Sequence, residues 1–317
     1  MPSFCLGLGA RSVGWGDGGL PRYELAVHDG LARGLLEGLI ACGHDVAFAR
    51  NLPLDHAFMT PIHLLFPQAD LPIVPLFQNC VAPPLPTVGR CLQLGGALRG
   101  VLAGIEPGLR VALIGTGGLS HEVPLHDWRS LPDDETGRAW LAFMSAGRAG
   151  ADPETGKRIA AEVDRWGREG PGRIDEDFDR ELLAWMQVGT YKRLADLDTA
   201  TIARRGGNGA QEIRNWATVM GAVPDTRGVL FYGRAAVADR SRGRGFRVSG
   251  SDLAVARRRD GRLNVLRSPP FQRGAGLPGL AVYTGSVGWL ACQANQYWVA
   301  TGTGLPSASV TSTRWSG

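Results

Sequence analysis

The chain has 317 residues, of which 44% are hydrophobic and 20% are charged, and this composition excludes a globally disordered protein. No apolar run approaches the roughly 18 residues that a membrane-spanning helix needs, and the N-terminal segment lacks the basic and apolar regions of a signal peptide. The net charge of +4 is unevenly distributed, because residues 235–317 carry eleven arginines, no lysine and three aspartates, while the preceding residues are mildly acidic.

The first part of the chain alternates short apolar runs with helical patterns. We predict strands at residues 3–10, 45–49, 71–77 and 110–118, and helices at residues 24–41 and 87–103. The first helix ends at Gly43, and the prolines of residues 71–77 favour an edge or strand-end position for that strand. This alternation predicts an α/β fold in which helices flank a central mixed sheet in a single main domain.

The second part is predominantly helical and then loses its regular pattern. We expect residues 131–172 to be a polar insertion with surface helices, followed by helices at 175–187, from 199 and at about 208–220, and a strand at 229–232. After residue 234 neither a helical nor a strand period is sustained. The sequence therefore predicts a main domain at 1–234 and an irregular, basic, low-order C-terminal tail at 235–317. Out-of-frame translation of a GC-rich gene is one explanation for this tail, because the chain has 32 Arg and 2 Lys.

Cysteine use and charge indicate the compartment and the partners. The chain has five cysteines and no CxxC pair, which is typical of a reduced, cytoplasmic protein with buried thiols; they are Cys5, Cys42, Cys80, Cys91 and Cys292. We expect no membrane partner. The arginines of the tail could contact phosphates, but no recognised nucleic-acid-binding motif accompanies them, so we do not expect nucleic acid as a partner.

Two of the six histidines lie where a site is expected. His121 follows the glycine turn of GTGGLSHE after a predicted strand, and sites in open α/β sheets gather at the carboxyl ends of strands. A histidine there can transfer protons near neutral pH, or it can simply cap a turn. His56 follows Asp55 in LDHAFMTPIHLL, where it can hydrogen-bond a polar substrate or be a core histidine bonded to a backbone carbonyl. We interpret the others as packed, surface or turn residues: His28, His44, His63 and His126.

Glu212 is the third candidate. It follows GGNGAQ and opens a predicted helix, where a carboxylate favours the helix N-terminus electrostatically. The functional alternative is a carboxylate ligand for a divalent metal. No HxH or HxxxH pair, complete dinucleotide fingerprint or GxSxG elbow is present, so these site types are not indicated.

The order of several motifs resembles the class III extradiol ring-cleaving dioxygenases. The motifs are LDHAFMTPIHLL, LPIVPLFQNCVAPPLP, RVALIGTGGLSH, DEDFDRELL and GGNGAQEIRNW, and the resemblance covers roughly residues 1–232. The family includes the β subunit of protocatechuate 4,5-dioxygenase and 2,3-dihydroxyphenylpropionate 1,2-dioxygenase. The resemblance implies an oxidoreductase of aromatic compound catabolism that uses Fe(II) and O₂ to open catecholic rings, and that can act as a homo- or hetero-oligomer.

The resemblance also implies roles for three residues. His121 matches the family's acid/base histidine, which deprotonates the diol and later returns a proton. His56 matches the histidine that contacts the substrate. Glu212 matches the carboxylate of the family's iron site, in which two histidines and one carboxylate hold Fe(II) and leave positions open for the diol and O₂.

This sequence departs from the family pattern in its iron ligands. The family's two histidine ligands precede the segment that matches MPSFCLGLG, so we expect this chain to lack them and to lose most of its affinity for Fe(II). Two alternatives remain open. The chain is an extradiol dioxygenase whose two histidines belong to a longer protein, or it is an inactive fragment or a non-catalytic binding or partner subunit with the same fold.

Overall fold

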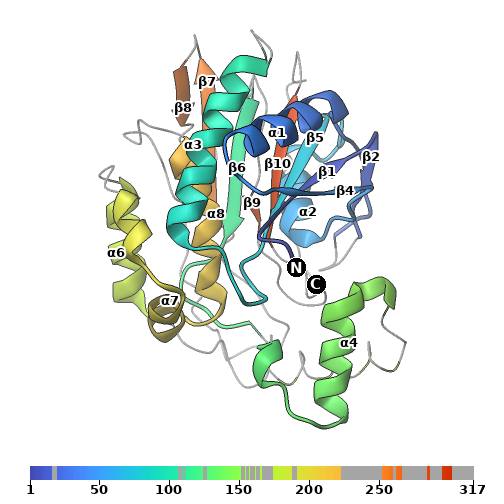
Figure 1. Ribbon diagram of the computed structural model, residues 1–317, viewed down its shortest axis with the longest axis vertical. Coiled ribbons are helices and arrows are strands. Elements are labelled where there is room, and N and C mark those ends of the chain that lie inside the picture. The colour runs from blue at the N-terminus through green and yellow to red at the C-terminus, as the bar shows by residue number, and fades with distance from the viewer. Residues whose placement is uncertain are drawn as a thin grey trace, which may run out of the picture.

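The computed structural model describes most of the first 222 residues and four short segments of the tail (Figure 1). The described residues are 1–15, 20–105, 109, 111–123, 127–150, 154, 157, 161, 165, 174–187, 191–222, 252–259, 262–265, 284–285 and 295–301. Three predictions fall outside these residues: the strand at 229–232, the assignment of His126, and the domain boundary at residue 234. The division into domain and tail therefore stays a prediction.

A mixed β-sheet forms the centre of the molecule. Its order is β4 (Ala47–Arg50), β1 (Phe4–Leu8), β5 (Ile73–Gln78), β10 (Asn295–Thr301), β6 (Val111–Gly117), β7 (Asp252–Arg259) and β8 (Arg262–Val265), and β9 (Thr284–Gly285) pairs with β10. Among the described strands of this sheet, β1 and β4 are the one parallel pair. Because β5 and β6 both run antiparallel to β10, they run in the same direction. Their carboxyl ends, at Gln78 and Gly117, therefore lie at the same edge of the sheet.

Strand β10 joins two halves of the sheet. It pairs with β5 from Asn295 to Ala300 and with β6 from Trp298 to Thr301. The sequence analysis did not anticipate strands β7 to β10, because the tail shows no sustained period. Long-range pairing with β5 and β6, rather than a local pattern, places these strands in the sheet.

Strand β5 differs from its predicted edge position. It has neighbours on both sides, β1 and β10, so the edge alternative is wrong, whereas the strand-end alternative holds for Pro72, which lies immediately before β5. The pairing with β1 ends at Leu76, and Pro75 lies just beyond it. A Cβ atom on Gly7 would approach Pro75 Cγ to 2.5 Å, so glycine on β1 leaves room for the proline ring. The sheet thus accommodates Pro75 where its missing N–H costs no bond to β1.

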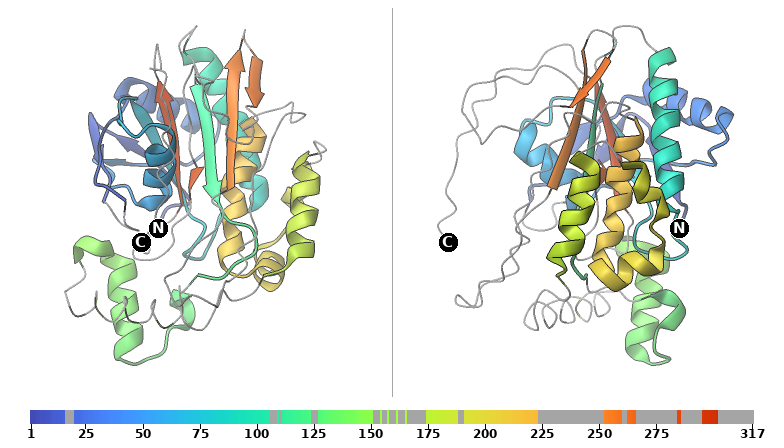
Figure 2. Two further views of the ribbon diagram at one scale, coloured as in Figure 1. Left: turned by 180° about the vertical axis from the view of Figure 1, so that it is seen from behind. Right: turned by 90° about the vertical axis from the view of Figure 1, so that its left-hand side faces the viewer.

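Helices cover both faces of the sheet. Figure 2 shows α1 (Asp29–Ala41) and α3 (Val88–Ile105) on one face and α2 (His56–Leu65) on the other. Helix α8 (Ile213–Ala222) packs closely against α3 where both helices have glycine. A Cβ atom on Gly95 or Gly221 would lie only 2.0 Å or 2.1 Å from a carbonyl oxygen of the facing helix, so a side chain at either position would prevent this approach. One continuous apolar core includes Leu35, Ile114 and Trp216. These elements confirm the predicted α/β class.

The remaining elements gather beyond the carboxyl ends of β5 and β6, at the lower end in Figure 1. They are η1 (Trp128–Ser130), α4 (Glu135–Gly150), α6 (Glu176–Gln187), η2 (Tyr191–Asp196), α7 (Thr199–Gly206) and η3 (Gly209–Glu212). Strands β2 (Arg11–Val13) and β3 (Glu24–Ala26) form a separate ribbon. Among the described residues, no helix combines the length and apolarity needed to cross a membrane.

Candidate active site

Two of the three predicted site residues meet at the carboxyl end of β6. The strand ends at Gly117, and the N–H of Gly118 donates a hydrogen bond to Glu212 Oε2 at 2.5 Å. His121 Nε2 lies 3.9 Å from Glu212 Oε1. Glu212 is the last residue of η3, just before α8, and its side chain is only 8% exposed. The structure therefore brings together an imidazole and a buried carboxylate that are 91 positions apart in the sequence.

The imidazole of His121 has a defined orientation. Its Nδ1 lies 2.8 Å from the carbonyl oxygen of Leu119. Because a carbonyl oxygen only accepts hydrogen bonds, Nδ1 carries the proton in the neutral ring. Nε2 then has the free lone pair and faces Glu212. The side chain is 29% exposed, so part of the ring is open to solvent.

A short ladder of hydrogen bonds holds His121 beside the GGNG loop of residues 206–209. The His121 N–H donates to the Gly206 carbonyl at 2.8 Å, and the Gly209 N–H donates to the His121 carbonyl at 3.0 Å. The side chain of Asn208 extends this ladder, because its Oδ1 accepts from the N–H of Val123 at 2.7 Å and its Nδ2 donates to the Val123 carbonyl at 2.8 Å. Asn208 thus pairs with Val123 as a neighbouring strand would.

Glycine is required where the GGNG loop meets His121. A Cβ atom on Gly209 would lie 2.4 Å from His121 Nε2, and one on Gly207 would lie 2.4 Å from the His121 carbonyl oxygen. Gly207 also has a φ of +81°, which L side chains rarely adopt. The loop can approach the histidine this closely only without side chains at these two positions.

A second carboxylate supports the same turn from α6. Asp179 Oδ1 accepts from the N–H of Ser120 at 2.8 Å, and Oδ2 accepts from the Ser120 hydroxyl at 2.7 Å. Burial raises the pKa of Asp179 above its usual value, and the charge of Asp175 raises it further. The bonds from Ser120 and the proximity of His121 oppose that rise in pKa. The charges of Asp179 and His121 therefore influence one another.

His56 lies at the same edge of the sheet, at the first residue of α2. Asp55 caps that helix by accepting from the N–H of Ala57 at 3.0 Å. The Ala57 carbonyl accepts from the Thr116 hydroxyl at 3.3 Å, which ties the start of α2 to the end of β6. His56 is half-buried there. These contacts bring it to the neighbourhood of Gly117.

Buried polar side chains tie α8 to the carboxyl ends of both strands. Asn215, one turn after Glu212, accepts from Gln78 Nε2 at 3.1 Å and donates to the Thr116 carbonyl at 3.0 Å. Thr218, one further turn along, donates to Gln78 Oε1 at 3.1 Å. All four residues are buried, so unpaired polar atoms would be costly here. This network fixes Glu212 relative to β5 and β6.

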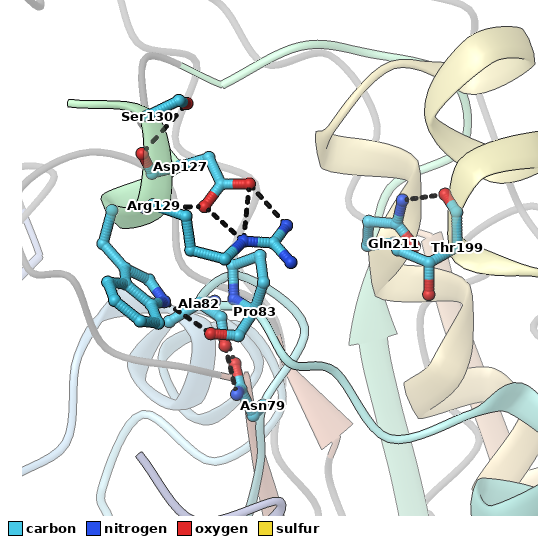
Figure 3. Close-up of polar contacts among 9 residues, drawn as sticks. Asn79, Ala82, Pro83, Asp127, Arg129, Ser130, Thr199 and Gln211 are labelled. Atoms are coloured by element: carbon cyan, nitrogen blue, oxygen red, sulfur yellow. Dashed lines mark hydrogen bonds and ion pairs between the residues drawn. The ribbon is translucent and has the colours of Figure 1, made fainter. Parts of the chain in front are cut away.

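Polar contacts hold the loop after β5, several of them drawn in Figure 3. Asn79 Nδ2 donates to the Ala82 carbonyl at 2.6 Å, and Trp128 Nε1 donates to the Pro83 carbonyl at 2.5 Å. Arg214 Nε donates to the Pro86 carbonyl at 2.6 Å, which connects the other end of the loop to α8. The loop is thus held by η1 at one point and by α8 at another.

Two of the other histidines in the described part of the chain make structural contacts. His28 caps α1 by accepting from the N–H of Leu31 at 3.1 Å, and His63 Nδ1 lies 2.7 Å from the Tyr23 hydroxyl. His44 lies in the turn after α1 but is only 5% exposed, and its burial lowers its pKa. None of these contacts involves His121 or Glu212.

Sequence reasoning missed the residues that support the site. Asp179 and Asn208 lie in DEDFDRELL and GGNGAQEIRNW, segments that carried the family resemblance, but only the fold shows what their side chains contact. Asn215 follows Glu212 by three positions, and this helical spacing was the one available signal that the two side chains share a helix face.

The described residues do not fit a ferrous ion by themselves. No group of three His, Cys, Asp or Glu side chains that could hold a metal occurs among them. Glu212 has one imidazole within 4 Å, whereas a ferrous site of the expected kind needs two histidine nitrogens and a carboxylate around one point. Because the resemblance assigns His121 to proton transfer rather than to the metal, both histidine donors would have to come from outside the described part of the chain.

Comparisons with known proteins agree with the motif order. A family model described as the catalytic LigB subunit of aromatic ring-opening dioxygenase matches residues 1–237. A 2,3-dihydroxyphenylpropionate/2,3-dihydroxicinnamic acid 1,2-dioxygenase of Photorhabdus laumondii is 35% identical over 229 residues, 70% of this chain and 69% of that protein. Proteins of the same name from Paraburkholderia xenovorans and Mycolicibacterium smegmatis are 32% and 34% identical, and each comparison covers 70% of both chains.

Proposed function

This chain belongs to the family of the catalytic LigB subunit of aromatic ring-opening dioxygenases, and we propose that it forms the acid/base and substrate-binding part of an extradiol dioxygenase site for catecholic aromatic acids. The observation that carries the proposal is the pair of His121 and Glu212. One imidazole nitrogen with a free lone pair faces a buried carboxylate, beside a glycine turn at the carboxyl end of a strand.

His121 is the proposed proton acceptor. Its Nδ1–H is held by the Leu119 carbonyl, so Nε2 can accept a proton from a catechol hydroxyl and later return it. His56, at the start of α2, is the proposed hydrogen-bonding partner of the substrate. The dihydroxyphenylpropionate in the names of the relatives indicates the substrate class: a vicinal diol on a ring with a short carboxylate side chain.

Ring opening with O₂ requires Fe(II) in the family that the sequence resembles. Glu212 is the carboxylate that this chain offers to the metal, and the described residues supply no complete ferrous site. Proton transfer and substrate binding are the roles of this chain's own residues.

The test separates binding from turnover. The full chain is titrated with 2,3-dihydroxyphenylpropionate by calorimetry, without metal and with anaerobically added Fe(II), and then exposed to O₂ while the yellow ring-opened product is monitored. We expect His121→Ala and His56→Ala to weaken binding by about tenfold each, the scale of one lost hydrogen bond to a buried polar group. His63→Ala is the matched control, because His63 contacts Tyr23 instead. Binding that is absent, or unchanged in both variants, contradicts the proposal.

A second candidate function is a non-catalytic subunit that binds the diol. The lack of a three-donor metal cluster among the described residues favours it. It predicts the same binding results but no ring-opened product at any Fe(II) concentration. Product formation that is lost in Glu212→Gln excludes this candidate, because a subunit without iron chemistry has no turnover to lose.

A further inference from the structure

We propose that Asp179 is a positioning residue that orients His121 toward Glu212 by holding the neighbouring Ser120. The inference rests on the proposed function only in giving His121 its acid/base role. Asp179 itself is separated from the ring by Ser120, so it acts through the backbone of the turn.

The contact between Asp179 and Ser120 is bidentate. One carboxylate oxygen accepts from the Ser120 N–H at 2.8 Å and the other from the Ser120 hydroxyl at 2.7 Å. Ser120 is only 6% exposed and Asp179 is half-buried, so both bonds are partly shielded from water. Hydrogen bonds to an ionised carboxylate are about twice as strong as those between neutral groups. Two such bonds fix both the backbone and the side chain of the residue that precedes His121.

The start of α6 is itself docked on the same serine. The N–H of Asp175 donates to Ser120 Oγ at 2.9 Å, and Asp175 Oδ1 caps α6 by accepting from the N–H of Phe178 at 2.8 Å. A Cβ atom on Gly206 would lie 2.8 Å from the Phe178 ring, so α6 also packs against the GGNG loop. Helix α6 thus contacts both segments that enclose His121.

These contacts fix His121 from two sides. Asp179 accepts from the Ser120 N–H, which belongs to the peptide group between Leu119 and Ser120, and the Leu119 carbonyl of that group contacts His121 Nδ1. Gly206 and Gly209 bind the His121 N–H and carbonyl. With the backbone held on both sides, the ring can satisfy Nδ1 with the nearby Leu119 carbonyl and direct Nε2 toward Glu212. Loss of the Asp179 bonds frees Ser120 and, with it, the backbone on which the His121 ring is mounted.

Three substitutions separate the hydrogen bonds from the charge. Asp179→Asn keeps an oxygen for the Ser120 N–H, and its amide nitrogen can donate to the Ser120 hydroxyl, so the contact survives without its charge. Asp179→Ala removes both bonds. Ser120→Ala removes only the hydroxyl bond. Asp177→Ala is the matched control on the same helix, because its side chain is 92% exposed and its ion pair is with Arg180.

The readout is the nitrogen NMR spectrum of His121 in the full chain labelled with ¹⁵N-histidine, in which His121→Asn identifies the signals. We expect the parent chain, Asp177→Ala and Asp179→Asn to show one ring form with Nδ1 protonated. In Asp179→Ala the Nε2-protonated form appears at a level at least tenfold above that in the parent. Ser120→Ala lies between them.

Affinity for 2,3-dihydroxyphenylpropionate is the second measurement. We expect a loss of about tenfold in Asp179→Ala and of less than threefold in Asp179→Asn, on the scale of one or two hydrogen bonds. An Asp179→Ala spectrum equal to that of Asp177→Ala overturns the proposal, and so does an Asp179→Asn variant as impaired as Asp179→Ala. If Asp179→Ala does not fold, Ser120→Ala and Asp179→Asn decide by the same criteria. The spectra report on His121 without ligand or iron, so failure of the diol to bind the parent chain counts against the proposed function alone.

Discussion

The backbone N–H of Gly209 donates to the His121 carbonyl at 3.0 Å, and the space that a side chain on Gly209 would occupy is filled by the His121 imidazole. The nearest ring atom, Nε2, would lie 2.4 Å from an added Cβ atom. Gly209 therefore binds the backbone of His121 through its N–H, and its lack of a side chain leaves room for the imidazole ring.

We predict that Gly209→Ala displaces the imidazole from Glu212. The ring must move because no Cβ contact of 2.4 Å is tolerated, and overpacking of this kind costs about 1–3 kcal/mol. Affinity for 2,3-dihydroxyphenylpropionate is expected to fall by about tenfold, measured by calorimetry on the folded variant. Gly100→Ala is the control, because nothing lies within 4 Å of its Cβ position on α3, and it should leave affinity unchanged. Equal affinity in both variants would contradict the prediction.

A second prediction concerns the pH dependence of stability at Asp179. Burial, the largest cause, and the charge of Asp175 raise its folded-state pKa above the unfolded value. Between these two pKa values the native state binds more protons than the unfolded state, so this group's contribution to stability falls as pH rises. Asp179→Asn removes that contribution. Urea midpoints measured from about pH 4 to 7 should therefore fall more steeply with pH in the parent chain than in the variant. A urea midpoint that falls more steeply with pH in Asp179→Asn than in the parent chain would contradict the prediction.

Much of the fold could be predicted from local patterns. Spaced leucines indicated α1, and the run of residues 110–118 indicated β6, because the periods of helices and buried strands are local properties of a sequence. Strand β10 could not be found in this way, since its place depends on pairing with β5 and β6, and the residues it pairs with lie at least 184 positions earlier in the chain. The edge alternative for β5 was wrong because a proline excludes a central strand only where its N–H is needed.

The candidate site was predicted in part. His121 and Glu212 were selected as candidates from their motifs, but their separation of 3.9 Å depends on the close approach of the GGNG loop to the β6 turn. Asp179 was not selected, because an aspartate in an acidic, exposed helix start is a common pattern. Its contact with Ser120 spans 59 residues, and no local period reports such a contact.

A third prediction concerns the thiols. Cys42 is exposed, whereas the other three cysteines of the described region are buried: Cys5, Cys80 and Cys91. Burial raises the pKa of Cys5 to about 11 and also raises that of Cys91, so both stay protonated and unreactive near neutral pH.

The experiment uses a Cys292→Ser background, because Cys292 lies outside the described residues. We expect a thiol reagent at about pH 8 to modify one cysteine per folded chain rapidly and the other three only at the rate of unfolding. Replacing Cys42 with serine should abolish the rapid phase. A rapid phase that persists in that variant would show that one of the buried thiols is accessible.

The last prediction concerns strand β10. Val299 lies opposite Val74 of β5 and Leu113 of β6, so its backbone is paired on both sides. Proline at this position removes a ladder hydrogen bond and places a ring between two strands, which we expect to cost about 3 kcal/mol or more. Leu263→Pro is the control, because β8 pairs only with β7 and an edge strand tolerates proline better. Urea unfolding of the full chain measures the stability of both variants.

Because β10 is the strand that connects β5 to β6, Val299→Pro should also weaken binding of 2,3-dihydroxyphenylpropionate at the carboxyl ends of these two strands. A Val299→Pro variant as stable as Leu263→Pro would show that the sheet does not depend on its tail strand.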